Sequence, residues 1–167
     1  MPHVDNAKQA ATMAEAFRFK PLGRRSIAGN YPHFGFKSQS ARETTTMLND
    51  ATLLVAMIET PDAIENIDAI AAVPGIDVLL MGTNDLCLEM GIPGEIDHPE
   101  VSTAIDGLIE ACKRHGKWAG LGGVYEPALL TQYIDRGFQM IIAGNDVTLL
   151  LDAATEQAQF IRNCDKR

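Results

Sequence analysis

Residues 52–86 constrain the fold of this chain most strongly, because two apolar runs in this stretch each lead to an acidic residue. Residues 53–58 run directly into Glu59, and residues 76–81 are followed shortly by Asp85. Two such runs joined by a helical pattern predict a βαβ unit with parallel strands. Neighbouring parallel strands lie about 4.8 Å apart. Both carboxylates are therefore expected at the carboxyl edge of the sheet, where α/β folds carry their chemistry.

Glu59 and Asp85 have no lysine or arginine between them in the sequence, so their approach is unfavourable unless a cation lies between them. A hard divalent cation such as Mg²⁺ fits, because it takes one or two protein carboxylates and keeps positions for water and an oxygen-rich substrate. The alternative is that each acid only begins or caps a helix. These residues alone leave both interpretations open.

The same stretch resembles the HpcH/HpaI aldolase family, the metal-dependent class II pyruvate aldolases that include 2,4-dihydroxyhept-2-ene-1,7-dioate aldolase. Residues 58–60 (I-E-T) match an I-E-[ST] motif at the end of one barrel strand, and residues 82–86 (G-T-N-D-L) match a G-x-x-D-L motif after the next. The likeness continues through residues 90–91 (M-G) and 98–101 (H-P-E-V). The chain has Met57 where these aldolases usually have glutamine, and methionine cannot donate an amide hydrogen bond to a substrate.

The resemblance implies a carbon-carbon lyase that reversibly cleaves 4-hydroxy-2-oxo acids to pyruvate and an aldehyde. Glu59 and Asp85 would hold Mg²⁺ or Mn²⁺, other divalent metals being possible, and the partner would be a small, pyruvate-like 2-oxo acid. Substrate contacts are expected from Gly82, Thr83, Asn84, Arg25 and Leu121. The family's catalytic arginine and histidine come from early strands that have no counterpart here, so no catalytic residue is assigned.

A loop rich in glycine, proline and aromatic residues is predicted over residues 20–38. Residues 21–25 (P-L-G-R-R) resemble the family's P-P-x-G-x-R segment, which makes Arg25 the matching arginine and a candidate partner for a substrate carboxylate. The alternative is that Arg24 and Arg25 pair with surface acids. His3 and His33 are interpreted as structural or solvent-facing.

Periodicity predicts helices over 7–17, 39–51, 61–73, 97–115, 126–136 and from 146 on, with further strands over 118–121 and 138–143. Residues 2–5 read as the end of a strand and a helix cap. Strands alternating with helices indicate an α/β fold with a parallel sheet. About four strands and a remnant, against eight in a closed (β/α)₈ barrel, predict the C-terminal half to two-thirds of a TIM barrel. Residues 1–167 are expected to form this single partial domain, with the family's N-terminal strands missing.

Composition limits the possible partners. With 46% hydrophobic and 22% charged residues the chain is typical of globular proteins. A net charge of −8 argues against nucleic acid and anionic membrane surfaces as partners. Three cysteines without metal-type spacing, and the lack of a signal peptide or a membrane-length apolar run, indicate the cytoplasm.

A second hypothesis stays open beside the aldolase: a non-catalytic, truncated barrel fragment that acts by association with itself or with a partner chain. In either case an incomplete sheet leaves unpaired backbone groups and apolar surface bare. The chain is therefore expected to form a homo-oligomer. In the resembling family dimer partners exchange a C-terminal helix, which makes residues 146–162 the expected contact.

Overall fold

A four-stranded parallel sheet forms the centre of the computed structural model, which describes residues 1–164. The strands are β1 (Val55–Ile58), β2 (Val78–Gly82), β3 (Trp118–Gly122) and β4 (Met140–Ile141). They lie in the order β1-β2-β3-β4, each parallel to the next. The predicted α/β fold with a parallel sheet is confirmed, because each pair of strands is joined by a helical crossover.

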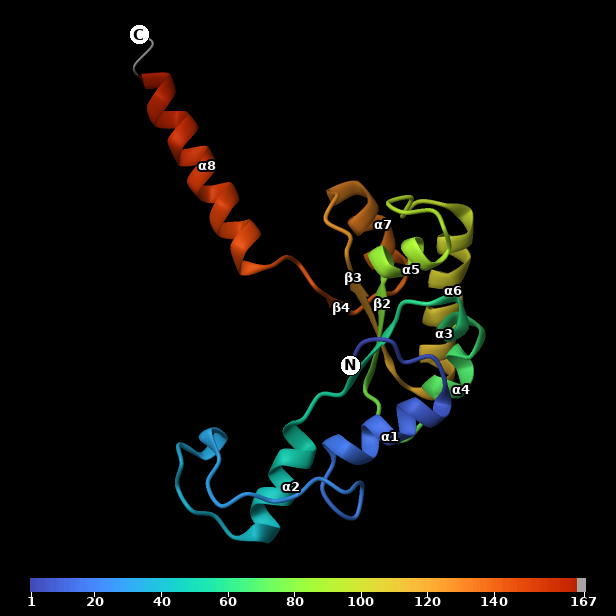
Figure 1. Cartoon of the computed structure of the whole chain (residues 1–167), viewed down its shortest axis with the longest axis vertical. Coiled ribbons are helices and arrows are strands. Elements are labelled where there is room, and N and C mark those ends of the chain that lie inside the picture. Colours follow the sequence, from blue (N-terminus) through green and yellow to red (C-terminus); the bar gives the residue numbers. More distant parts are fainter. Residues whose placement is uncertain (165–167) are drawn as a thin grey trace.

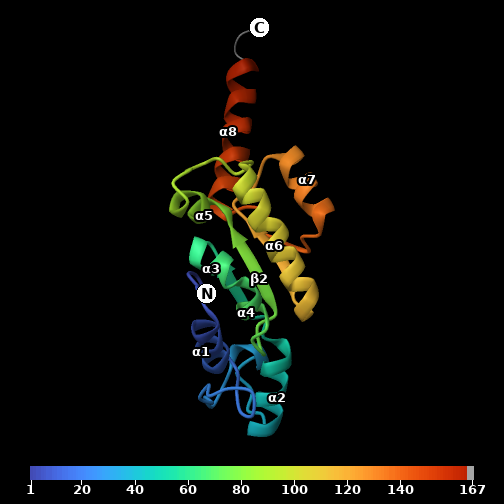
Figure 2. The same cartoon turned by 90° about the vertical axis from the view of Figure 1, so that its right-hand side faces the viewer.

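Eight α-helices and one 3₁₀-helix occur among residues 1–164. They are α1 (Ala7–Phe17), η1 (Pro32–Phe34), α2 (Ala41–Ala51), α3 (Pro61–Glu65), α4 (Ile67–Ala71), α5 (Thr83–Glu89), α6 (Pro99–His115), α7 (Pro127–Arg136) and α8 (Asp146–Cys164). Figures 1 and 2 show α3, α4 and α6 together over one face of the sheet, while α8 projects away from it. None of the helices in this described part is long and apolar enough to span a membrane.

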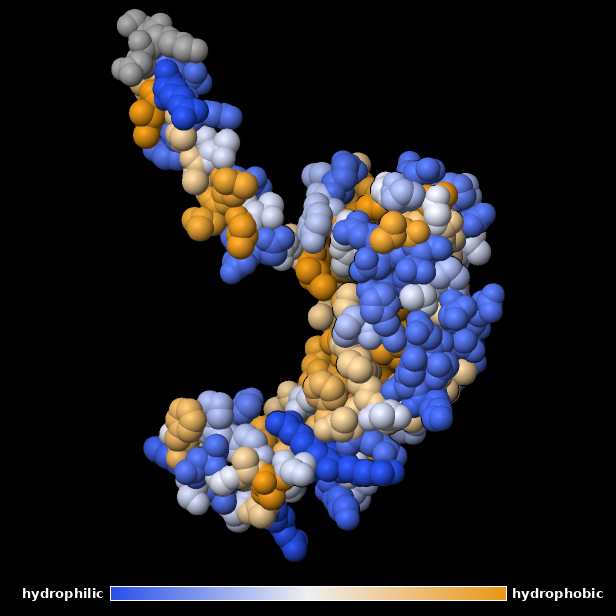
Figure 3. Space-filling model, viewed as in Figure 1, coloured by the Kyte–Doolittle hydropathy of each residue, from blue (hydrophilic) through white to orange (hydrophobic). Residues whose placement is uncertain are grey.

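The core lies between the sheet and the helices that cover it. Alternate strand residues point into this layer, and the buried side chains include Ile58, Leu79, Met81, Ala119 and Leu121. The opposite face has no described helix over it, and the space-filling view shows apolar residues along this concave side of the molecule (Figure 3). A parallel sheet is normally covered on both faces. In the described residues, helices cover only one face of this sheet (Figure 1).

The N-terminal residues 1–4 lie beside β1, on the edge away from β2. The Met1 amino group donates to the Val55 carbonyl at 2.9 Å, and the Met57 N–H donates to the Met1 carbonyl at 2.9 Å. The predicted strand remnant is therefore present. The N-cap of α1 is Asn6, whose side chain accepts from the Gln9 N–H, and not Asp5 as expected.

Two predicted elements are wrong in extent. The helix expected over residues 61–73 is divided at Asn66 into α3 and α4, because the backbone there leaves the helical region and the Asn66 side chain donates to the Asp62 carbonyl. The buried strand expected over 138–143 shrinks to β4, which is only partly buried. The Phe138 N–H bonds back to the Tyr133 carbonyl of α7, so the strand begins later than its apolar residues.

Arg18 closes the amino edge of the sheet. Its side chain is buried and donates to the carbonyls of Asn49, Thr52 (2.8 Å) and Gly75 (3.2 Å), and to the Asp77 carboxylate at 2.6 Å. These acceptors precede β1 and β2, so one guanidinium joins the end of α1 to the start of both strands. The carboxyl edge of the same strands lies at the other end of the sheet.

Candidate functional site

Glu59 and Asp85 both lie at the carboxyl edge of the sheet. Ile58 pairs with Met81 in the register of β1 and β2, so Glu59 leaves its strand beside Gly82. The chain after Glu59 turns at once into α3, because Thr60 caps that helix and proline occupies its first position. Asp85 lies in the first turn of α5, directly after β2, and is exposed to solvent.

The two oxygens of the Glu59 carboxylate have different surroundings. Glu59 is only 1% exposed, and its Oε1 accepts a hydrogen bond from the His3 backbone N–H at 2.8 Å. The imidazole Nδ1 of His3 lies 3.7 Å from the same oxygen. Oε2 is buried and has no hydrogen-bond partner among the described residues. An unpaired buried carboxylate oxygen is unfavourable, so this atom is suited to a cation or to a ligand's donor.

Two glycines, Gly82 and Gly123, leave space beside the side chains of Glu59 and Asn84. A Cβ atom on Gly82 would lie 2.7 Å from the Glu59 Oε2, too close for the carboxylate to keep its place. Gly123, with a φ of +87°, allows the Asn84 side chain to approach, since a Cβ there would lie 3.1 Å from its Nδ2. The Thr83 hydroxyl donates to the Gly122 carbonyl at 2.9 Å, which ties the start of α5 to the end of β3.

Glu59 and Asp85 are the two carboxylates at this edge that would hold a divalent metal. No group of three or more histidine, cysteine, aspartate or glutamate side chains gathers as a metal site within residues 1–164. The unpaired Oε2 of Glu59 and the exposed carboxylate of Asp85 match the donor set of Mg²⁺, which commonly takes one or two carboxylates and completes its shell with water and substrate oxygens.

Leu121 and Arg25, two predicted substrate contacts, lie elsewhere. The Leu121 side chain is buried in the core between the sheet and the helices, so only its backbone is available at the edge. The Arg25 N–H bonds to the Arg18 carbonyl at 2.9 Å, which holds Arg25 near the amino edge of the sheet. The structure thus brings neither side chain to Glu59 and Asp85, and both contacts stay predictions. For Arg24 the alternative, a pair with a surface acid, is observed: its side chain lies 2.9 Å from the Glu15 carboxylate.

His3, which the sequence analysis interpreted as structural or solvent-facing, is a direct neighbour of Glu59. Its backbone has a φ of +49°, a left-handed conformation, and this turns its N–H toward the carboxylate. The signal was present in the sequence, because His3 lies in the strand remnant that neighbours β1 and runs toward the same edge. Reading the remnant as a neighbour of β1 would have placed His3 next to Glu59.

The parallel sheet, its crossover helices and a pair of acids at the carboxyl ends of adjacent strands define part of a (β/α) barrel. The chain belongs to the HpcH/HpaI aldolase/citrate lyase family, whose model matches residues 1–153. It is 34% identical over 99% of its length to a 4-hydroxy-4-methyl-2-oxoglutarate aldolase of Chaetomium globosum, and covers 62% of that protein. It is 36% identical over 97% of its length to a hydroxypyruvate/pyruvate aldolase of Cupriavidus necator, and covers 60% of that protein.

A solved structure confirms the fold. The crystal structure of an HpcH/HpaI aldolase from Desulfitobacterium hafniense matches with a TM-score of 0.86 and 29% identity, over 97% of this chain and 62% of the other. The predicted family and the predicted partial barrel are both confirmed. The chain spans about three fifths of the length of the curated relatives that it matches.

Proposed function

We propose that this chain carries the metal-binding part of a class II aldolase that cleaves 4-hydroxy-2-oxo acids to pyruvate and an aldehyde. Its relatives include proteins named as aldolases of 4-hydroxy-4-methyl-2-oxoglutarate and of hydroxypyruvate and pyruvate. The observation that carries the proposal is the Glu59 Oε2, which is buried, unpaired among the described residues and next to Gly82. The relatives' names favour this function over that of a non-catalytic fragment.

Glu59 and Asp85 would hold Mg²⁺ or Mn²⁺, and a bound ion of this kind polarises a 2-oxo group as a Lewis acid. The His3 N–H occupies Oε1 of Glu59 and so leaves Oε2 as the free acceptor. The backbone N–H groups of Thr83 and Asn84, in the first turn of α5, have no acceptor within that helix and would bind the substrate carboxylate. Gly82 would leave room for the substrate beside Glu59.

The proposal also includes two further substrate contacts, the extent of the domain and the cellular location. Leu121 would contact the substrate through its backbone, and Arg25 would need a carboxylate that approaches the amino edge. Residues 1–167 would form one partial barrel domain, of which residues 165–167 lie outside the described part of the chain. A cytoplasmic location agrees with the unpaired state of all three cysteines, Cys87, Cys112 and Cys164, since reducing compartments keep thiols free.

We also propose that the chain forms a homo-oligomer. No residue of α8 is buried, and its exposed apolar side chains are Val147, Leu149, Leu150, Leu151, Phe160 and Ile161. A cluster of exposed apolar side chains on a helix without buried residues favours an interaction site. Light scattering in dilute buffer should give a mass of at least twice the 18.1 kDa of one chain. A compact, stable monomer would contradict this proposal.

The metal site is tested by Mn²⁺ titration, followed by the paramagnetic relaxation of water protons, with and without oxalate as a stand-in for the substrate. Two carboxylates make a weak site alone, so we expect weak binding that tightens at least about tenfold, or about 1.4 kcal/mol, with oxalate. Glu59→Gln and Asp85→Asn keep the side-chain size but remove the charge, and each should abolish the tightening.

Asp62→Asn is the matched control, because Asp62 is an exposed acid in the same βαβ unit and begins α3. It should bind Mn²⁺ and oxalate as the unchanged protein does. Equal binding by the unchanged protein and all three variants would mean that Glu59 and Asp85 only support helices.

A further inference from the structure

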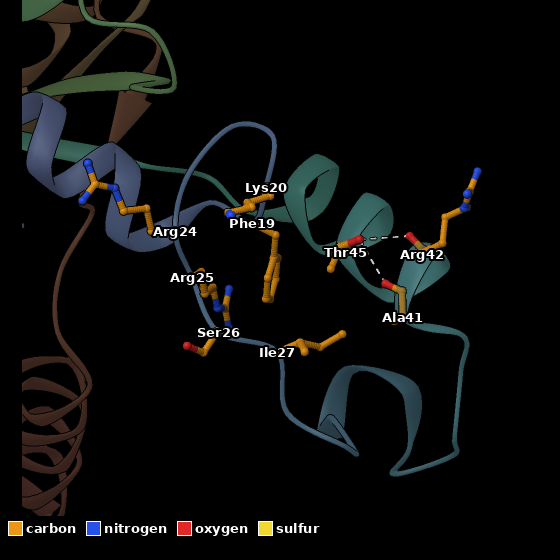
Figure 4. A pocket seen from close by; sticks show the side chains of 9 residues that line it. All are labelled: Phe19, Lys20, Arg24, Arg25, Ser26, Ile27, Ala41, Arg42 and Thr45. Carbon is orange, nitrogen blue, oxygen red and sulfur yellow. Dashed lines mark hydrogen bonds between the residues drawn. The ribbon is translucent and has the colours of Figure 1, made fainter.

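A basic pocket of about 430 Å³ lies between the segment after α1 and the first turn of α2 (Figure 4). We call it the Arg25 pocket. Its charged and apolar lining includes Phe19, Lys20, Arg24, Arg25, Ile27 and Arg42. It lies near the amino edge of the sheet, where Arg18 joins the same segment to the strands, and is therefore separate from the edge that carries Glu59.

The charge of this pocket is opposite to that of the chain. Four lysine and arginine side chains line it and no aspartate or glutamate does, although the whole chain has 14 basic and 22 acidic residues. This local excess of positive charge favours an anionic ligand.

Arg25 is held ready for such a ligand. Its guanidinium stacks on the Phe19 ring, 4.8 Å from the ring centre, and Phe19 is itself buried. The backbone N–H of Arg25 is fixed by the Arg18 carbonyl. A guanidinium over an aromatic ring can still donate from its N–H groups to an oxyanion.

Three of the four cations have no acidic partner among the described residues. Arg24 pairs with Glu15. Arg25, Lys20 and Arg42 make no ion pair with any of residues 1–164, and Figure 4 shows Arg24 and Arg42 extending to opposite sides of the pocket with Arg25 beside Phe19 in the middle. With three cations unpaired around the pocket, a ligand with several negative charges is the better match, and the Arg42 side chain would turn inward to reach it.

We propose that the Arg25 pocket binds a small oxyanion with two or more negative charges, with Arg25 as the central contact and Lys20 and Arg42 at its sides. The side chains of Phe19 and Ile27 would contact the apolar part of such a molecule. A phosphate-bearing compound and a di- or tricarboxylate share this chemistry. The site goes beyond the proposed aldolase reaction, because it needs neither the metal nor the carboxyl edge.

Calorimetry in metal-depleted buffer, with pyrophosphate and citrate as the probes, tests this proposal on the full chain. We expect at least one of the two to bind, and Arg25→Ala to weaken that binding at least tenfold. Pyrophosphate alone would identify a phosphate site, and citrate alone a polycarboxylate site. Arg42→Ala should weaken the same probe less than Arg25→Ala does, and it provides a second variant that leaves the stacking on Phe19 intact.

Lys37→Ala is the matched control, because Lys37 is exposed in the same segment but does not line the pocket. It should change the affinity less than twofold. The proposal is overturned if neither probe binds, if the Arg25 and Arg42 variants both bind as the unchanged protein does, or if Lys37→Ala weakens binding equally. Glu59→Gln should retain the probe's affinity, so a failure of the metal site leaves this result unaffected.

Discussion

Two buried charged side chains at opposite edges of the sheet differ in how many of their polar atoms have a hydrogen-bond partner. Arg18 at the amino edge uses its two terminal nitrogens for three backbone carbonyls and the Asp77 carboxylate, and only its Nε lacks a partner. Glu59 at the carboxyl edge has one hydrogen bond and one unpaired oxygen among the described residues. The charged group at the amino edge is thus bound by the protein's own contacts, whereas the one at the carboxyl edge keeps an unpaired acceptor.

This difference agrees with the division of work in (β/α) barrels, where residues at the amino ends of the strands serve stability and those at the carboxyl ends serve chemistry. Asp77 extends the closed side, since its Oδ2 accepts from the Leu54 N–H at 2.7 Å as well as from Arg18. Removing each buried charge in turn should therefore affect different properties of the protein.

The largest effect is expected at the amino edge. Arg18→Met keeps much of the side chain's volume but leaves three carbonyls without their donor and Asp77 with only the Leu54 N–H. Each buried acceptor left unpaired costs about 1 to 3 kcal/mol, so urea denaturation should show a loss of about 3 kcal/mol or more in the free energy of unfolding. Arg114→Met, which removes an exposed partner of Asp68, is the control and should cost far less. Similar losses for the two variants would contradict the comparison.

The corresponding change at the carboxyl edge is Glu59→Gln. It removes the unpaired charge while the side-chain carbonyl can still accept from the His3 N–H. We expect the free energy of unfolding to change by no more than about 1 kcal/mol, while the oxalate-dependent binding of Mn²⁺ is lost. A loss of stability as large as that of Arg18→Met would mean that both edges serve the fold.

A smaller effect on metal binding than that of Glu59→Gln is expected from Gly82→Ala. The new methyl group would lie 2.7 Å from the Glu59 Oε2 and 3.0 Å from the Glu59 Cβ, so the carboxylate must move. We expect a loss of about 1 to 3 kcal/mol in stability from overpacking. The affinity for Mn²⁺ in the presence of oxalate should fall about tenfold, which corresponds to about 1.4 kcal/mol.

Gly107→Ala serves as the control for this variant. Gly107 lies inside α6, and a Cβ atom there would meet no other atom within 4 Å. Alanine in a helix interior is favoured over glycine by about 0.5 to 1 kcal/mol, so this variant should be slightly more stable and should bind Mn²⁺ unchanged. Equal affinities in the two glycine variants would show that the space beside Glu59 is not used by a ligand.

Much of the fold could be predicted from local patterns. The helix α6 was predicted with its end at His115, because its apolar residues recur at helical spacing and Gly116 adopts the left-handed conformation that ends it. The pairing of β1 with β2 followed from two apolar runs joined by a helical segment. Patterns of this kind depend only on neighbouring residues, so the sequence displays them directly.

The contacts that distinguish the two edges could not be predicted in this way. The acceptors of Arg18 lie 31 to 59 residues away in the sequence, and nothing near Arg18 marks it as buried. The unpaired oxygen of Glu59 depends on His3, which lies 56 residues earlier. For Arg25, the matching motif singled out an arginine as a candidate contact, but it did not predict that this residue lies near the amino edge of the sheet.

The order of the strands in the sheet has a consequence for how the chain folds. Each of the strands β1 to β4 pairs with its neighbour along the sequence, so these four strands can form the sheet by closing one crossover at a time. Closing short segments costs less chain entropy and gives faster folding. During synthesis, Glu59 and Asp85 can therefore reach the same edge of the sheet as soon as β1, β2 and their crossover have formed, before α6 and the later strands are available.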